Sequence, residues 1–196
     1  LLDLSAQALA TEGRLPEELR LHGSGVDLMD GYYQFKIPQL GSYFGVDFPE
    51  RAEDFGCTEV YCENSGTFAP VEPDRKVFFV FDGLSMGWSW ALHFCHCVTE
   101  DVMATALKPA QGPAPRVILR EGQPSPGFKD TDVLGAPYVD NANSICVGDR
   151  DAAAFVYYLS EIFDAVGLRY RVEARSEHSW PIIGIVLDAS SRTLCN

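Results

Sequence analysis

Two aspartates occupy positions in this sequence where a carboxylate could take part in chemistry. Asp27 lies in the apolar stretch 26–29, and Asp140 directly follows the apolar stretch 136–139. Two carboxylates brought close together repel each other unless a divalent cation lies between them, and oxygen ligands of this kind suit Mg²⁺. Two such ions about 3.5–4 Å apart would activate a hydroxyl group and stabilise a leaving phosphate oxygen. Taken singly, each aspartate is more typical of a capping or turn residue.

The elements that must position these aspartates can be predicted from hydrophobic periodicity and turn residues. The expected order is a strand at 26–29, a helix at 88–107, a hairpin of strands 136–139 and 144–147 turning at 140–143, a helix from an Asp149 N-cap to 166, and strands at 169–173 and 182–187. This βαββαβ order predicts an α+β fold, a ferredoxin-like antiparallel sheet with helices on one face. Because the first strand and the hairpin are neighbours in such a sheet, Asp27 and Asp140 can meet at one edge.

Turn-forming residues divide the rest of the chain. The sequence Gly23-Ser24-Gly25 predicts a break before the first strand. Aromatic, β-favouring stretches follow at 43–48, 58–62 and 76–81, separated by acidic turns rich in proline and glycine. Residues 109–137 are rich in proline and glycine and are interpreted as an insertion, with one possible strand at 116–119.

Among six cysteines and four histidines, the cluster His93-Phe94-Cys95-His96-Cys97 raises the question of a zinc site. His93 and Cys97 are one helical turn apart and share a helix face, but one helix supplies two ligands at most, and no second pair spaced like CxxC supplies the others. We therefore predict small core residues here, with zinc as the alternative. No basic segment precedes an apolar one near the start, so no signal peptide is visible, and the expectation is reduced thiols in an intracellular protein that is not secreted.

Short motifs around the two aspartates resemble those of reverse transcriptases. Residues 26–38 resemble motif A, Leu84-Ser85-Met86-Gly87 resembles the turn of motif B, and Tyr138-Val139-Asp140-Asn141 resembles the Tyr-x-Asp-Asp of motif C. Gly167-Leu168 with the following arginine-rich strand is similar to motif D, and Gly184 lies where motif E carries its glycine. The motifs occur in the family's order over most of residues 26–188, which a chance match of one motif would not explain.

The resemblance implies a palm domain that transfers a nucleotide from a deoxynucleoside triphosphate to a primer 3′-OH with two Mg²⁺ or Mn²⁺ ions. Asp27 and Asp140 would be catalytic and would hold the metals, with Asn141 beside them. The implied nucleotide-binding residues are Leu28, Gly31, Tyr32, Met86, Gly87 and Tyr138. Among these, Tyr32 would be the steric gate that excludes a ribose 2′-OH, and Met86 and Gly87 would line the nascent base pair.

The sequence departs from the family pattern at several of these positions. Asn141 stands where the second aspartate of motif C is usual, which removes one negative charge from the metal site. Ser85 replaces the usual proline of motif B, and the segment resembling motif D offers arginines rather than a lysine that could donate a proton. These departures leave open a second interpretation, a catalytically degenerate relative that acts as a binding or interaction module. A third is an unrelated ferredoxin-like domain.

Length and charge bear on how much of a polymerase this chain contains. Its 196 residues have a hydrophobic fraction of 46%, which excludes a disordered chain, and a net charge of −13, which disfavours phosphate binding by the chain alone. We expect a fragment of a retrotransposon-type polymerase: a remnant of the fingers at 1–25, the palm at 26–188, and a short tail at 189–196 without a complete thumb. The template–primer would then be held mainly by other parts of a full-length protein, and no membrane is expected.

Overall fold

The computed structural model describes residues 21–41, 43–62, 64–108, 116–124, 126, 133–189 and 193–195. It divides into two compact units, each described here by itself. The sheet unit comprises Leu1–Gly31 and Leu92–Asn196, and the insert unit comprises Tyr32–Ala91. Most of the predicted fingers remnant and much of the proline- and glycine-rich segment lie outside the described residues.

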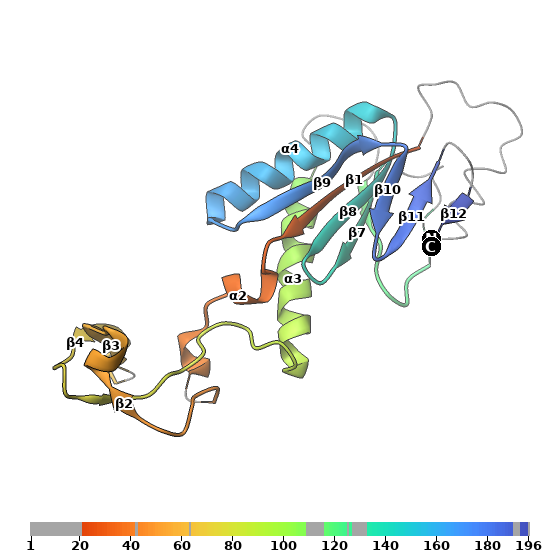
Figure 1. Ribbon diagram of the computed structural model, residues 1–196. Coiled ribbons are helices and arrows are strands. Elements are labelled where there is room, and N and C mark those ends of the chain that lie inside the picture. Colours follow the sequence, from red (N-terminus) through yellow and green to blue (C-terminus); the bar gives the residue numbers. More distant parts are fainter. Residues whose placement is uncertain are drawn as a thin grey trace, which may run out of the picture. The chain divides into compact units, whose positions relative to one another are not determined.

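The sheet unit is built on five strands, whose order across the sheet is β6, β7, β8, β1 and β9. The last four of these are labelled in Figure 1. Their bounds in that order are Arg116–Ile118, Val133–Tyr138, Asn141–Val147, Leu21–Leu28 and Tyr170–Glu177. The neighbouring strands are antiparallel, except that β6 runs parallel to β7. With helix α3 (Ser89–Ala106) after β1 and helix α4 (Asp149–Val166) after β8, the chain has the predicted βαββαβ order, with β6 added at one edge.

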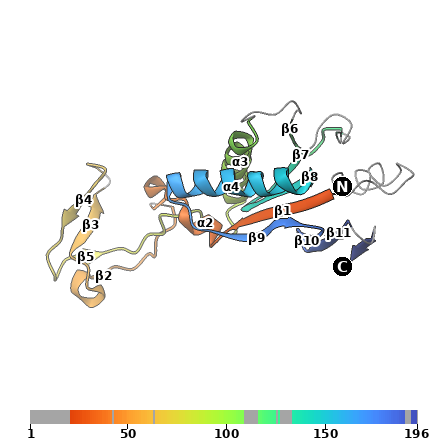
Figure 2. The same cartoon turned by 90° about the horizontal axis from the view of Figure 1, so that it is seen from above.

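The two helices lie on the same face of the sheet (Figure 2). Helix α4 buries Phe155, Leu159 and Phe163, which recur at helical spacing, and it ends at Gly167, whose φ of 73° closes the last turn. Helix α3 packs on β7. The side chains of Met103 in the helix and of Leu107 just after it lie against the backbone of Gly135, where a β-carbon would come within 2.8 Å of Leu107. Both helices were predicted within one residue of these bounds.

The opposite face of the sheet is covered over part of its area by the end of the chain. Strands β10 (Ser179–Ile182), β11 (Ile185–Asp188) and β12 (Thr193–Cys195) form a small antiparallel sheet. A second apolar cluster lies between this sheet and the main one. Its buried members are Leu134, Ile145, Ala174, Trp180 and Ile182. The C-terminal strands therefore cover the part of this face that lies around β1 residue Gly23, against which Trp180 packs.

The insert unit contains short elements with little regular pairing. Its strands are β2 (Glu50–Arg51), β3 (Glu59–Cys62), β4 (Thr67–Pro70) and β5 (Lys76–Val77), with α2 at Gly31–Gln34 and 3-10 turns at Pro38–Leu40 and Ala52–Phe55. Strand β2 pairs with β5, and β3 pairs with β4. The strand predicted at 58–62 is confirmed as β3.

Two other strand predictions in the insert unit are wrong in extent. Residues 43–48 form no strand, because the N–H groups of Tyr43 and Phe44 bind the Leu40 carbonyl in a turn, which leaves a single bridge between Gly45 and Val80. The stretch 76–81 pairs regularly only over Lys76–Val77.

In the sheet unit, the predicted break at Gly23-Ser24-Gly25 is wrong, because these residues lie inside β1. A β-carbon on Gly23 would come within 1.7 Å of the Trp180 ring, so glycine is required for that ring to pack on the strand. Ser24 is fully buried, but its hydroxyl forms a 2.6 Å hydrogen bond with the hydroxyl of Ser144 on the neighbouring strand. The buried polar group is thus satisfied by a partner 120 residues away.

Three further boundaries differ from the sequence prediction. The β7–β8 turn consists of Val139 and Asp140 alone, so residues 141–143 belong to the strand. Asp149 is the first residue of α4 rather than its N-cap, which is Gly148 and makes no side-chain bond. Residues 182–187 are not one strand, because the β10–β11 turn divides them at Ile183 and Gly184, which both have positive φ, as type I′ turns require.

Within the described part of the chain, no helix is long and apolar enough to cross a membrane.

The close approach of Trp180 to Gly23 predicts a large effect of a single methyl group. Gly23→Ala forces the Trp180 ring out of its buried position, so we expect a loss of about 1–3 kcal/mol or more in the free energy of unfolding, measured by urea denaturation. Gly45→Ala is the matched control, because the nearest atoms to its β-carbon lie at 3.4–3.6 Å. Equal stability of the two variants would show that Trp180 does not pack on β1.

Candidate active site

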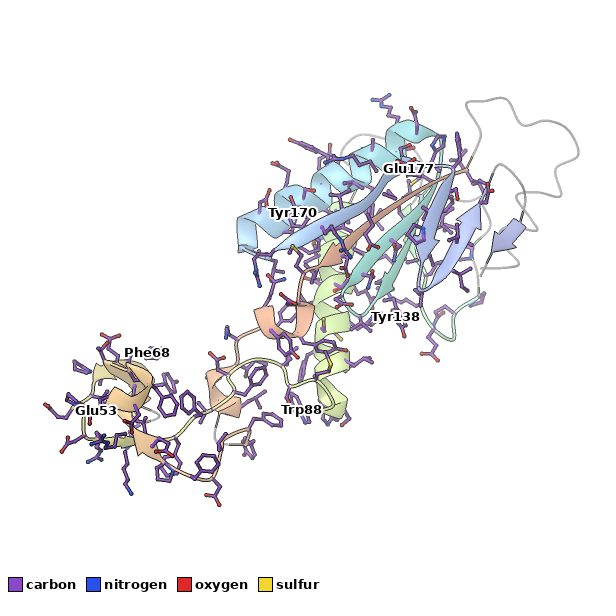
Figure 3. All side chains as sticks on the ribbon, viewed as in Figure 1. Glu53, Phe68, Trp88, Tyr138, Tyr170 and Glu177 are labelled. Atoms are coloured by element: carbon purple, nitrogen blue, oxygen red, sulfur yellow. The ribbon has the colours of Figure 1, made fainter. Side chains whose placement is uncertain are left out.

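A row of polar side chains crosses the sheet near one end of β1. In the pairing register, Tyr138 of β7 lies opposite Asn141 of β8, Asn141 lies opposite Asp27 of β1, and Asp27 lies opposite Arg171 of β9. Directly paired residues project from the same face of a sheet, so these four share one face. It is the face against which Trp180 packs, since Gly23 and Asp27 are four residues apart on one strand. Figure 3 shows Tyr138 and Tyr170 toward this end of the sheet and Glu177 toward the other.

Asp140 lies beside this row because the β7–β8 turn is tied to β1. The Leu28 N–H donates a 3.0 Å hydrogen bond to the Asp140 carbonyl, and the Asn141 side-chain amide donates a 3.1 Å bond to the Asp140 carboxylate. Gly31 leaves room for the aspartate, because a β-carbon there would lie 2.7 Å from the Asp140 β-carbon. The structure thus brings Asp27, Leu28 and Gly31 together with Asp140 and Asn141.

The guanidinium of Arg171 forms an ion pair with the Asp27 carboxylate. Its Nη2 lies 3.2 Å from Asp27 Oδ2 and 3.0 Å from Glu173 Oε1. The Asp27 side chain is 22% exposed and that of Arg171 is 65% exposed, so the carboxylate is partly desolvated while the guanidinium remains in solvent. A second ion pair joins Arg169 to Asp30 at 3.6 Å on the adjoining loop.

The surroundings raise the pKa of Asp27 above its ordinary value of 3.8. The largest cause is burial, followed by the negative charges of Asp140 and Glu173, and the positive charge of Arg171 only partly offsets them. The negative charge on Asp27 is therefore unfavourable in the folded chain, which is the situation that a bound cation would relieve.

The donor atoms at this point fit a hard divalent cation. Asp27 and Asp140 supply carboxylate oxygens, Asn141 supplies an amide oxygen while its nitrogen is bound to Asp140, and no soft ligand is needed. Across the part of the chain that the structure describes, no group of three or more histidine, cysteine, aspartate or glutamate side chains is placed to hold a metal. The arrangement consequently resembles a site that has two carboxylates rather than three.

Three of the residues implied by the family resemblance belong to the insert unit. Tyr32 accepts a hydrogen bond at its carbonyl from the Leu84 N–H at 3.2 Å. Met86 is 66% exposed, and Gly87 has a φ of 96°, which favours glycine in the turn that leads into α3. Their predicted contacts with a nucleotide stay predictions.

The cysteine and histidine cluster at the start of α3 divides into buried and exposed members. Cys95 is fully buried, and burial together with the charge of Asp140 raises the pKa of its thiol to about 12. A thiol with that pKa stays protonated at neutral pH and is a poor metal ligand. His93 and Cys97 contact each other on the helix surface, with Cys97 Sγ 3.7 Å from His93 Nε2. The five cysteines whose side chains the structure describes are thiols rather than disulfides.

Sequence reasoning missed three residues that contact this site. Arg171 and Glu173 were visible only as part of a charged strand, because their relation to Asp27 depends on the pairing register of β9 with β1. His96 was assigned to the cysteine–histidine cluster, whereas its Nδ1 accepts a 3.2 Å hydrogen bond from the Val139 N–H in the turn that carries Asp140. No spacing rule in the sequence links residues 96 and 139.

Comparison with known proteins identifies the fold. No family model matches the sequence, and no curated protein is detectably similar to it. Among solved structures, the chain is similar to apo telomerase from Candida tropicalis, with a TM-score of 0.54 and 12% identity over 100% of this chain and 35% of that chain. The same telomerase truncated from its C-terminal domain gives a TM-score of 0.49 and 13% identity over 100% of this chain and 38% of that one.

The chain therefore spans about a third of the length of the telomerase chains it matches. Telomerase is a reverse transcriptase-related enzyme, and at this low identity the likeness shows a shared reverse transcriptase-like fold.

The raised pKa of Asp27 predicts how stability depends on pH. The folded chain holds the Asp27 proton more tightly than the unfolded chain, so the ionised carboxyl lowers the free energy of unfolding as the pH rises from about 4 through the raised pKa. Asp27→Asn removes that cost, and we expect its Tm to exceed that of the wild type by roughly 1–3 °C at pH 7. The difference should disappear near pH 3, where both side chains are neutral.

Asp30→Asn is the matched control for this prediction. Asp30 has a positive φ, which asparagine tolerates as well as aspartate does. Its exposed ion pair with Arg169 contributes at most about 1 kcal/mol to the free energy of unfolding. We expect no increase in Tm for this variant. A lower Tm at pH 7 for Asp27→Asn would show that the Arg171 ion pair outweighs burial and carboxylate repulsion.

Proposed function

We propose that this chain is the palm of an RNA-directed DNA polymerase, which transfers a nucleotide from a deoxynucleoside triphosphate to a primer 3′-OH. The observation that carries the proposal is the meeting of Asp27 and Asp140 at one end of a βαββαβ sheet. Strand pairing places Asp27 opposite Asn141, and the bond from the Leu28 N–H holds Asp140 beside it. The reverse transcriptase-like fold and the order of the sequence motifs support the same function.

Asp27 and Asp140 would hold Mg²⁺ or Mn²⁺, two ions in the complete site, through their carboxylate oxygens. A bound divalent cation supplies positive charge that lowers the pKa of a hydroxyl and stabilises phosphate oxygens. The chain's own part is to hold the two carboxylates close together and partly shielded from water. Arg171 donates a hydrogen bond to the Asp27 carboxylate, and the Asn141 amide donates one to the Asp140 carboxylate. These two bonds would hold the carboxylates in place.

The resemblance supplies the remaining roles in this proposal. Tyr138 would pack near the primer end, and Tyr32 would favour deoxynucleotides by its bulk. Met86 and Gly87 would contact the nascent base pair. A retrotransposon-type parent and an intracellular location belong to the same proposal. With a net charge of −13, the chain alone should bind the template–primer weakly, and lysine- and arginine-rich regions of a longer protein would supply the grip.

A second candidate function is supported by the contacts of the two carboxylates. Arg171 contacts Asp27, and the Asn141 amide contacts Asp140, so each acid already has an internal partner. Such a site could persist in a degenerate relative that serves as a binding or interaction module and no longer uses metal. Cation binding distinguishes the two functions.

Divalent cations should stabilise the wild-type chain through both aspartates. At a concentration ten times the Kd, binding adds about 1.4 kcal/mol, which raises Tm by roughly 3–5 °C for a chain of this size. We expect this shift with Mn²⁺ or Mg²⁺ in differential scanning fluorimetry, and its loss in Asp27→Asn and Asp140→Asn. Asn141→Asp should increase the shift, because a third carboxylate is added to the site.

Primer extension then tests the reaction itself. A hairpin template–primer with an RNA template arm is incubated at high concentration with the chain, deoxynucleotides and Mn²⁺. We expect slow extension that Asp27→Asn abolishes and Asn141→Asp accelerates. A cation shift that is the same in the wild type and in both aspartate variants would refute the polymerase function and leave the degenerate module.

The contact between Arg171 and Asp27 predicts that this arginine opposes cation binding. Arg171→Gln removes a positive charge next to the site, and we expect the Kd for Mn²⁺ to decrease by about threefold to tenfold at low ionic strength. The measurement is isothermal titration calorimetry at 20 mM and 200 mM salt, where the higher salt should reduce the difference. Arg175→Gln, on the same strand, is the control that leaves Asp27 paired. Weaker binding by Arg171→Gln would mean that the arginine orients Asp27 for the cation.

A further inference from the structure

The turn that presents Asp140 has an unfavourable backbone conformation. Val139 is the first of the two turn residues, and its φ is 55°, in the left-handed region where β-branched residues are rare. Its side chain is 7% exposed, so the residue cannot relax by moving into solvent. A turn of this kind normally has glycine at this position, which indicates that surrounding contacts hold Val139 in place.

Hydrogen bonds from both sides hold this turn. The Asp140 carbonyl accepts from the Leu28 N–H of β1 at 3.0 Å, and the Val139 N–H donates to His96 Nδ1 of helix α3 at 3.2 Å. The imidazole accepts at Nδ1, so the neutral ring carries its proton on Nε2. The backbone on either side of the Val139–Asp140 peptide is thus fixed by a different element.

A charged pair lies near the other side of the His96 ring. Its Nε2 lies 4.0 Å from Glu100 Oε2, one turn further along α3, and Glu100 Oε1 accepts a 2.6 Å hydrogen bond from Arg120 Nε. Arg120 lies in the segment between β6 and β7, so the series of contacts connects that segment to the turn. At 4.0 Å the Glu100 carboxylate lies beyond hydrogen-bond distance of His96, so the direct contact that the ring makes with the turn is the bond from the Val139 N–H.

We propose that His96 is a positioning residue for Asp140: by accepting the Val139 N–H, its imidazole holds the strained turn and so presents the Asp140 carboxylate beside Asp27. The expected effect of His96 on cation binding rests on the proposed function. The anchoring itself is a property of the turn and can be measured without a cation.

Two variants of His96 separate anchoring from simple packing. Asparagine has a side-chain oxygen close to the place of Nδ1 and can accept the Val139 N–H, whereas leucine fills a similar volume and accepts nothing. His93→Asn is the matched control, because His93 lies on the same helix, one turn before Cys97, and its ring contacts Phe94 and Cys97.

The direct measurement is the hydrogen-exchange rate of the Val139 amide, monitored by NMR in the absence of divalent cations. We expect His96→Leu to reduce the protection of this amide by about tenfold or more, and His96→Asn to restore most of it. The second measurement is Mn²⁺ binding by calorimetry. His96→Leu should weaken it by about tenfold, as loss of a residue that orients a ligand does, while His96→Asn and His93→Asn stay near the wild type.

The two measurements distinguish failure of this inference from failure of the proposed function. Unchanged protection of the Val139 amide in His96→Leu would overturn the inference, as would weakening of Mn²⁺ binding to the same extent in the asparagine and leucine variants. If the amide loses protection as expected but the wild type shows no Mn²⁺ binding that depends on Asp140, His96 still anchors the turn and the polymerase function is refuted.

Discussion

The partly buried carboxylate of Asp27, next to other carboxylates at one end of the sheet, is the constraint on which the arrangement of this site depends. Asp27 is partly buried beside Asp140 and Glu173, and its raised pKa reports that the negative charge is disfavoured there. A chain selected for stability alone would place an uncharged residue at position 27. Keeping the charge requires compensation, and the structure supplies it with the guanidinium of Arg171, the amide of Asn141 and the hydrogen bonds that fix the turn.

The way the sheet is covered explains why this end is accessible. Helices α3 and α4 cover one face, and the C-terminal hairpin covers only part of the other, where Trp180 packs on Gly23. The row that contains Asp27 lies four residues further along β1, beyond that contact. Bulky apolar packing thus gives rigidity next to the site, while Tyr138, at 48% exposure, and Arg171 remain in contact with solvent. Rigid elements of this kind hold a site more accurately than free loops do.

The sequence predicts well what depends on local pattern and poorly what depends on distant partners. Helices α3 and α4 follow from helical periodicity, and the β7–β8 hairpin follows from two apolar stretches around Asp140. By contrast, Gly23 and Ser24 have the composition of a turn, and they form a strand only because Trp180 and Ser144 contact them from far along the chain. The roles of Arg171 and His96 were missed for the same reason, since register and packing, not spacing, bring them to the aspartates.

Asn141 shows how charge and order are balanced at this site. It lies directly opposite Asp27, so an aspartate at 141 would add a further carboxylate to a place where burial and the charges of Asp140 and Glu173 already raise the pKa of Asp27. Asparagine removes that repulsion and donates a hydrogen bond to Asp140, which orders the carboxylate without a cation. The same substitution lowers the charge available to attract a cation. Asn141 therefore stabilises the cation-free chain at the expense of cation affinity. The two carboxylates remain adjacent because Arg171 offsets the charge of Asp27 and Asn141 donates a hydrogen bond to Asp140.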